Sequence, residues 1–91
     1  MQYKINMYAI VVYDVNVSRQ NQIREFLRKY LYHVQRSVFE GEISPSSLYY
    51  MKKILQSYIG ETDSLIIYVL RDKSCLMDKI VLGEDKDLQI Y

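Results

Sequence analysis

Two segments of the chain have the apolar, β-branched and aromatic composition of β-strands. The first is Met7 to Val15, MYAIVVYDV, and the second is Ser64 to Leu70, SLIIYVL. A third extended segment is predicted from His33 to Ile43, in which Gly41 permits a bend or bulge. We also expect short edge strands near residues 80–82 and 88–91.

Two further segments have apolar residues at helical spacing. The first is predicted to begin near Ser18, which can cap a helix, and to continue from Arg19. The second begins at Ser44-Pro45, a capping hydroxyl followed by a proline at the first helical position, and Gly60 is placed to end it. The apolar positions are Ile23, Phe26, Leu27, Tyr30 and Leu31 in the first helix, and Leu48, Met51, Leu55, Tyr58 and Ile59 in the second.

The order of these elements predicts an α+β fold. A chain of 91 residues is long enough for one domain with a single modest core, so we expect one domain over residues 1–91. Residues 1–6 are interpreted as an N-terminal extension and residues 84–91 as a C-terminal edge strand or tail. Strand, helix, strand or hairpin, helix and strand in this order suggest a ferredoxin-like α/β plait, an antiparallel sheet with two helices on one face.

The predicted strands are apolar on both faces, although two helices can cover only one. A strand with one face in water should alternate apolar and polar residues. In Ser64 to Leu70 both sets of alternate residues are apolar, and in the first strand Ile10 and Val12 share a side with Asp14. Covering this second face is worth several kcal/mol at about 25 cal/mol per Å² of apolar area. We therefore expect a homodimer packed through its sheets.

The composition narrows the class of protein. Apolar residues are 49% and charged residues 25% of the chain, as in a folded globular domain. No apolar run approaches the length of a membrane span and no signal-peptide pattern is present, so no membrane partner is expected. Cys75 is the single cysteine and cannot form an internal disulfide, which favours a reducing, cytoplasmic location. The formal net charge is only +1, so attraction to nucleic acid would have to come from a local patch.

Asp14 places one carboxylate in the otherwise apolar run VVYDV. One interpretation is that the strand ends there and the aspartate begins a turn. The other is that, near a two-fold axis, two copies of Asp14 face each other and bind a cation. Magnesium prefers oxygen ligands, and a metal held in this way can polarise a phosphoryl oxygen and generate hydroxide, which is the chemistry of phosphodiester cleavage. The residues alone leave both interpretations open.

Three segments occur in an order that points to a known family: YDV at residues 13–15, VQRSVFEGEIS at 34–44 and DSLIIYVL at 63–70. In a chain of this length they resemble the small CRISPR-associated protein of spacer acquisition, the lesser partner of the integrase in prokaryotic adaptive immunity. The resemblance extends over residues 7–83. It implies a ferredoxin-like homodimer whose last strand crosses to the partner protomer, Mg²⁺ (with Mn²⁺ as an alternative) as cofactor, and the CRISPR integrase subunit and RNA or duplex DNA as partners.

The resemblance also implies roles for individual residues. The metal-binding aspartate of the family falls on Asp14, its aromatic neighbour on Tyr13, and an aromatic residue linked to activity on Phe39. His33 stands where relatives often have arginine, so a phosphate-binding role does not transfer to it directly. As the single histidine, with an ordinary pKa near neutrality, it remains a catalytic candidate.

The basic residues are the candidates for nucleic-acid binding. Some relatives have arginines early in the first helix where this chain has Gln20 and Gln22. The arginines that remain can form a stripe for phosphates, doubled by a dimer, or an ordinary solvated surface. The nucleic-acid-binding candidates are Arg19, Arg24, Arg28 and Arg36.

Two functions are consistent with these residues. In the first, the protein is a magnesium-dependent endonuclease, cutting single-stranded RNA or double-stranded DNA, in which paired Asp14 carboxylates hold the metal. In the second, it is a non-catalytic architectural dimer that bridges integrase dimers and binds the backbone of duplex DNA.

Overall fold

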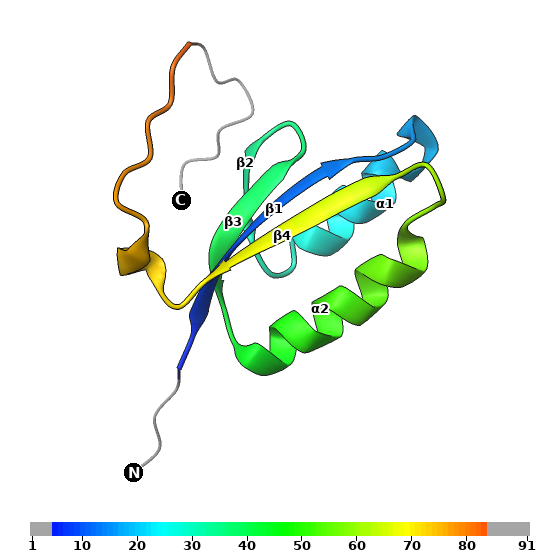
Figure 1. The fold of residues 1–91 in the computed structure, drawn as a ribbon. Helices are drawn as coiled ribbons and strands as arrows, with labels where there is room; N and C mark the ends of the chain where they lie inside the picture. The colour runs from blue at the N-terminus through cyan, green and yellow to red at the C-terminus, as the bar shows by residue number, and fades with distance from the viewer. Residues whose placement is uncertain (1–4, 84–91) are drawn as a thin grey trace.

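The computed structural model describes residues 5–83, which form a four-stranded antiparallel sheet with two helices on one of its faces (Figure 1). The strands pair in the order β2-β3-β1-β4. This arrangement confirms the predicted α+β fold and has the element order of a ferredoxin-like plait. Along the chain the elements are β1 (Met7–Asp14), α1 (Val17–Leu27), β2 (Tyr32–Gln35), β3 (Val38–Ile43), α2 (Pro45–Tyr58), β4 (Ser64–Leu70) and a short 3-10 helix, η1 (Lys73–Cys75).

The start of α2 was predicted correctly and the start of α1 was not. Ser44 caps α2, its side chain accepting a hydrogen bond from the backbone N–H of Ser47, and Pro45 occupies the first helical position. Helix α1, in contrast, is capped by Asn16, whose side-chain oxygen accepts hydrogen bonds from both the N–H and the hydroxyl of Ser18. Ser18 is therefore the second residue of the helix and not its cap, although serine and asparagine are equally good capping residues.

The segment from His33 to Ile43 folds as a β-hairpin. Strands β2 and β3 pair antiparallel and turn at Arg36 and Ser37, with Arg36 at φ +34°. The register irregularity lies between His33 and Gln35, so the bulge predicted at Gly41 is wrong. Gly41 instead allows a close approach, because a Cβ there would lie 3.3 Å from Cδ2 of Leu31.

The core lies between the helices and the facing side of the sheet. In β1 the side chains of Ala9, Val11 and Tyr13 are buried on that side, since alternate residues of a strand share a face. They pack against buried residues of both helices and of β3; the members from these other elements are Ile23, Phe26, Leu27, Phe39, Ile43, Leu48, Met51 and Leu55. The predicted apolar stripes of both helices are thus in the core or against it.

The helix-free face of the sheet carries an apolar ladder across β1 and β4. Ile10 pairs with Tyr68 and Val12 with Ile66, and the next pair along the ladder is Asp14 with Ser64. Val12 is 36% exposed, Ile66 47% and Tyr68 54%. The prediction that this face is apolar and not fully covered within one copy is therefore confirmed for these residues.

After η1 the chain continues beside the sheet without regular structure through residue 83. The edge strand predicted near residues 80–82 is therefore not formed, and the one predicted at 88–91 lies outside the described residues, as do residues 84–91 as a whole. Lys79 forms an ion pair with Glu40 of β3, which holds this segment against the sheet. None of the helices within residues 5–83 has the length and apolar character needed to cross a membrane.

Candidate functional site

The end of β1 presents two of the predicted site residues to opposite faces of the sheet. Tyr13 points to the helix side, where it is buried in the core, whereas Asp14 is exposed on the helix-free side. This separation follows from the two-residue period of a strand. The predicted catalytic residues therefore do not form one cluster within a single copy of the chain.

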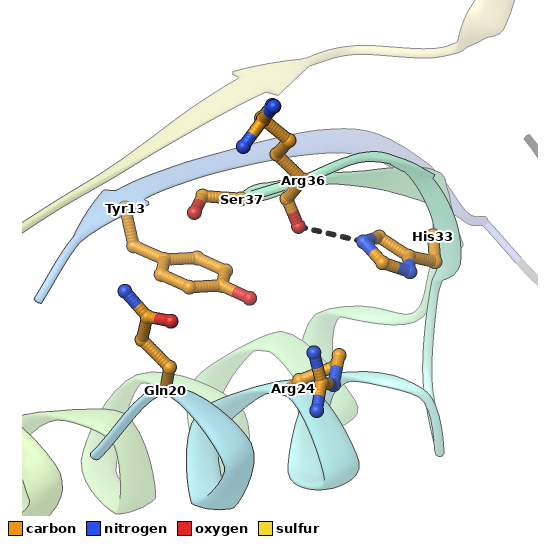
Figure 2. A pocket seen from close by; sticks show the side chains of 6 residues that line it. All are labelled: Tyr13, Gln20, Arg24, His33, Arg36 and Ser37. Carbon is orange, nitrogen blue, oxygen red and sulfur yellow. Dashed lines mark hydrogen bonds between the residues drawn. The ribbon is translucent and has the colours of Figure 1, made fainter. Parts of the chain in front are cut away.

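On the helix side, six residues line a cavity of about 270 Å³ between the sheet and α1 (Figure 2). We call it the hairpin cavity, because half of its lining comes from the β2–β3 hairpin. Helix α1 contributes two residues and β1 contributes one. The lining residues are Tyr13, Gln20, Arg24, His33, Arg36 and Ser37.

His33 is fixed in this cavity by two contacts. Its ring stacks on that of Phe39, the facing residue of β3, with 4.5 Å between the ring centroids and 10° between the planes. Its Nε2 lies 2.6 Å from the backbone oxygen of Arg36, to which it donates a hydrogen bond (Figure 2). The imidazole thereby ties β2 to the turn of its own hairpin, and Nε2 carries the proton.

Phe39 is completely buried beneath the cavity. It stacks on Tyr13 on one side, with 6.3 Å between centroids, and on His33 on the other. Any effect of Phe39 on activity therefore acts through the positions of these two rings.

Burial raises the pKa of the Tyr13 phenol above its ordinary value, against the opposing effects of the Arg24 and Arg28 charges and of the Ser37 hydroxyl. The phenol is thus neutral at physiological pH. It can donate a hydrogen bond but is a poor proton acceptor.

Arg19 binds a partner within the protein. Its Nε donates to Oδ2 of Asp63 at 2.5 Å, and the same carboxylate accepts hydrogen bonds from the backbone N–H groups of Gly60 and Asn16 at 2.8 and 2.9 Å. The Arg19 hydrogen bond and then that of Gly60 lower the pKa of Asp63 well below its usual range. Asp63 was not among the predicted site residues, and the signal for it in the sequence is a carboxylate in the turn directly before a strand.

The other predicted basic residues differ in their surroundings. Arg24 and Arg36 line the hairpin cavity. Arg28 is on the exposed side of the end of α1, with one guanidinium nitrogen 3.9 Å from Glu25. The structure therefore brings Arg24 to Tyr13 and His33, whereas Arg36 lies at the cavity with its side chain pointing away from them (Figure 2). Arg28 does not line the cavity although its charge acts on Tyr13, and Arg19 is bound to Asp63.

Asp14 offers hard oxygen ligands of the kind that magnesium prefers. Within residues 5–83, however, no three His, Cys, Asp or Glu side chains lie close enough together to hold a metal ion. Among the β1–β4 pairs of the apolar ladder, one copy has a single carboxylate, that of Asp14. A second copy that brought its own Asp14 to the same place would complete a pair of carboxylates of the kind that holds a divalent cation.

Comparison with known proteins gives concordant results. The family model described as CRISPR associated protein Cas2 matches residues 7–77. The CRISPR-associated endoribonuclease Cas2 of Thermococcus kodakarensis is 43% identical over 82 residues, which are 89% of this chain and 93% of that protein. The protein of the same name from Pyrococcus furiosus is 50% identical over 66 residues, 71% of this chain and 78% of that one.

Two solved structures are also similar. A Cas2 crystal structure superimposes with a TM-score of 0.84 at 43% identity, covering 94% of this chain and 97% of the other. That of Streptococcus pyogenes Cas2 at pH 6.5 gives a TM-score of 0.68 at 28% identity, covering 81% and 99%.

Proposed function

This chain belongs to the Cas2 family of CRISPR-associated proteins, and from this premise we propose that it is a magnesium-dependent endonuclease acting as a homodimer. Its relatives are named endoribonucleases, which favours single-stranded RNA as substrate, with double-stranded DNA as the other substrate proposed. We place the activity in the cytoplasm, in the spacer-acquisition step that the integrase completes.

The observation that carries the proposal is the position of Asp14 at the end of an apolar ladder. The pairs Ile10–Tyr68 and Val12–Ile66 lie next to the pair Asp14–Ser64 on the helix-free face. Burying the exposed apolar side chains against a second copy is favourable, and it brings Asp14 to the edge of the resulting seam. Under two-fold symmetry each Asp14 then has its counterpart nearby.

The paired Asp14 carboxylates are the residues that would hold Mg²⁺, or Mn²⁺ in its place. When bound, the metal supplies polarisation of a phosphoryl oxygen and activation of water. The contribution of Asp14 is its negative charge and its fixed place at the strand end. Arg28, exposed on the same protomer, provides a positive charge for the phosphates of the substrate backbone.

The test is the substitution Asp14→Asn, which keeps the shape of the side chain and removes its charge. We expect magnesium-dependent cleavage to fall on the order of 100-fold or more, the loss of several kcal/mol of transition-state stabilisation. Glu61→Gln is the matched control, because Glu61 is an exposed carboxylate in the turn before β4. Cleavage by purified Asp14→Asn at the wild-type rate would contradict the proposal.

A non-catalytic architectural dimer that bridges integrase dimers is the second candidate. It is favoured by the presence of only one carboxylate, that of Asp14, among the β1–β4 pairs of the ladder in each copy. The two functions differ in cells: if Asp14→Asn abolishes cleavage while spacer acquisition continues, the architectural role is the biological one. Loss of both would favour the nuclease.

A further inference from the structure

We propose that residues 73–83 form a strap that closes over part of the helix-free face and competes with a second copy of the chain for that surface. The ion pair between Lys79 of the strap and Glu40 of β3, here called the clasp, holds the strap closed. The inference rests on the homodimer of the proposed function, whose formation the strap limits. It depends neither on the metal nor on cleavage.

The clasp is attached in the same row of the sheet as the apolar ladder. Glu40 faces Ile10 across the β1–β3 pairing, and Ile10 faces Tyr68 across the β1–β4 pairing. Directly opposite residues of antiparallel strands point to the same side of a sheet, so these three side chains share the helix-free face. The strap therefore attaches on the surface that we propose for the second copy, two strands away from Tyr68.

The helix-free face is covered unevenly within one copy. Tyr8 and Glu40 are buried, whereas Ile66 and Tyr68 are about half exposed. The helices pack on the opposite face, but the strap runs along the side of the sheet away from them (Figure 1). A carboxylate as buried as that of Glu40 requires a positive partner, and the strap supplies it. The strap thus covers the β3 side of the face and leaves the β4 side open.

The strap spans a groove and does not pack closely on the sheet. A groove of about 840 Å³ lies between the strap, the sheet and the turn that joins α1 to β2. Its lining includes Asn6, Tyr8, Glu40, Lys73, Leu76 and Lys79. Three apolar side chains of the strap, those of Met77, Ile80 and Leu82, are at least 74% exposed. Because closing buries little of this apolar area, the clasp has a large share in holding the strap.

The clasp is weak enough to open. The Lys79 side chain is 38% exposed, and an ion pair in partial contact with water changes an equilibrium by about five-fold at most. A second copy that covers the whole helix-free face has to displace the strap of each protomer. The strap thus opposes dimer formation, and a dimer forms at the cost of two clasps.

The first experiment tests whether the clasp forms within one chain. A carbodiimide joins a lysine to a carboxylate that contacts it, so it should link Lys79 to Glu40. An equal mixture of ¹⁵N-labelled and unlabelled wild-type chains is treated, and the linked peptides are identified by mass spectrometry. We expect both peptides of each link to carry the same label. Links between a labelled and an unlabelled peptide, or absence of the link, would overturn the proposal.

The second experiment measures the dimer Kd by sedimentation equilibrium without magnesium. Lys79→Gln removes the clasp through a side chain that the open strap does not need. We expect Kd to fall about five-fold for each strap, up to about 25-fold for the dimer. Lys73→Gln is the matched control, because it removes the same charge from the same strap and groove but not from the clasp, and it should leave Kd unchanged. Glu40→Gln, which breaks the clasp from the other side, should also lower Kd.

A Kd that is unchanged or raised by Lys79→Gln would overturn the proposal, as would an equal fall in Lys73→Gln. If wild type and Lys79→Gln are both monomeric at every concentration, the homodimer is lost together with the strap. If wild type dimerises and Lys79→Gln leaves Kd unchanged, the strap alone is refuted. Because neither measurement contains magnesium or substrate, the outcome of the Asp14→Asn cleavage test does not affect them.

Discussion

Arg19 and Asp63 form an ion pair that joins the start of α1 to the turn before β4. Asp63 also accepts hydrogen bonds from the backbone N–H of Asn16, which caps α1, and from that of Gly60, which follows α2. One carboxylate thus fixes the two loops that flank the Asp14–Ser64 end of the ladder. Its role is to position this end of the sheet.

Asp63→Asn should lower the stability of the fold at neutral pH, and the decrease relative to wild type should be smaller at acidic pH. The pKa of Asp63 is lower in the folded state than in the unfolded state, where it is about 4. The carboxylate therefore contributes fully to the free energy of unfolding above pH about 4, and this contribution is lost as the pH falls through the folded-state pKa. We expect the thermal midpoint of the variant to be several degrees below wild type at pH 7, with the gap shrinking below pH about 4.

The measurement is thermal unfolding by circular dichroism between pH 2 and 7. Glu61→Gln, a neighbouring exposed carboxylate, should show no such pH-dependent gap. A gap that is constant across the pH range would mean that the charge of Asp63 is unimportant.

Phe39→Ala should destabilise the fold by about 3–5 kcal/mol, because the ring is fully buried and leaves a cavity. Phe39→Leu fills more of that space and should cost less. Urea unfolding gives the free energies, and cleavage is then compared per folded molecule. We expect the folded Phe39→Leu variant to cleave at the wild-type rate, since the residue lies beneath the cavity surface. A large loss of cleavage without unfolding would indicate that the Phe39 ring is needed to position Tyr13 or His33.

The Tyr13→Phe variant should cleave at least ten times faster than the Asp14→Asn variant, because removal of a metal-binding charge is expected to have the larger effect. The phenol is held neutral by burial and lies on the opposite face from the carboxylate. Parallel rate measurements under saturating magnesium test this. Equal losses in the two variants would show that both faces contribute to one active site.

More of the fold than of the candidate site could be predicted from the sequence. Strand composition and helical spacing depend on local sequence, and Ser44-Pro45 marks a helix start by local chemistry alone. The cap of α1 was misplaced because Asn16 and Ser18 are both good capping residues, and only the three-dimensional path of the chain decides between them.

The site depends on contacts between distant segments, which a single sequence does not give. Arg19 was predicted to bind nucleic acid, but its partner is 44 residues away in the chain. The grouping of Arg24 and Arg36 in one cavity likewise depends on how the hairpin sits over α1. That Tyr13 and Asp14 face apart, in contrast, follows from strand geometry and was predicted by the alternation in β1.

Ile66→Lys should prevent dimer formation if the sheets pack through the apolar ladder. Ile66 is 47% exposed on the helix-free face beside Val12, so a lysine there would place a charge within the seam. Val69 in the same strand has the same exposure of 47% but alternates to the helix side, which makes Val69→Lys a matched control. We expect sedimentation equilibrium to give a dimer for wild type and Val69→Lys and a monomer for Ile66→Lys. Because each copy supplies one Asp14, the monomeric variant should also lose magnesium-dependent cleavage. A monomer that still cleaves would show that a single carboxylate suffices. A wild-type protein that is itself monomeric would remove the dimer interface on which the metal site depends.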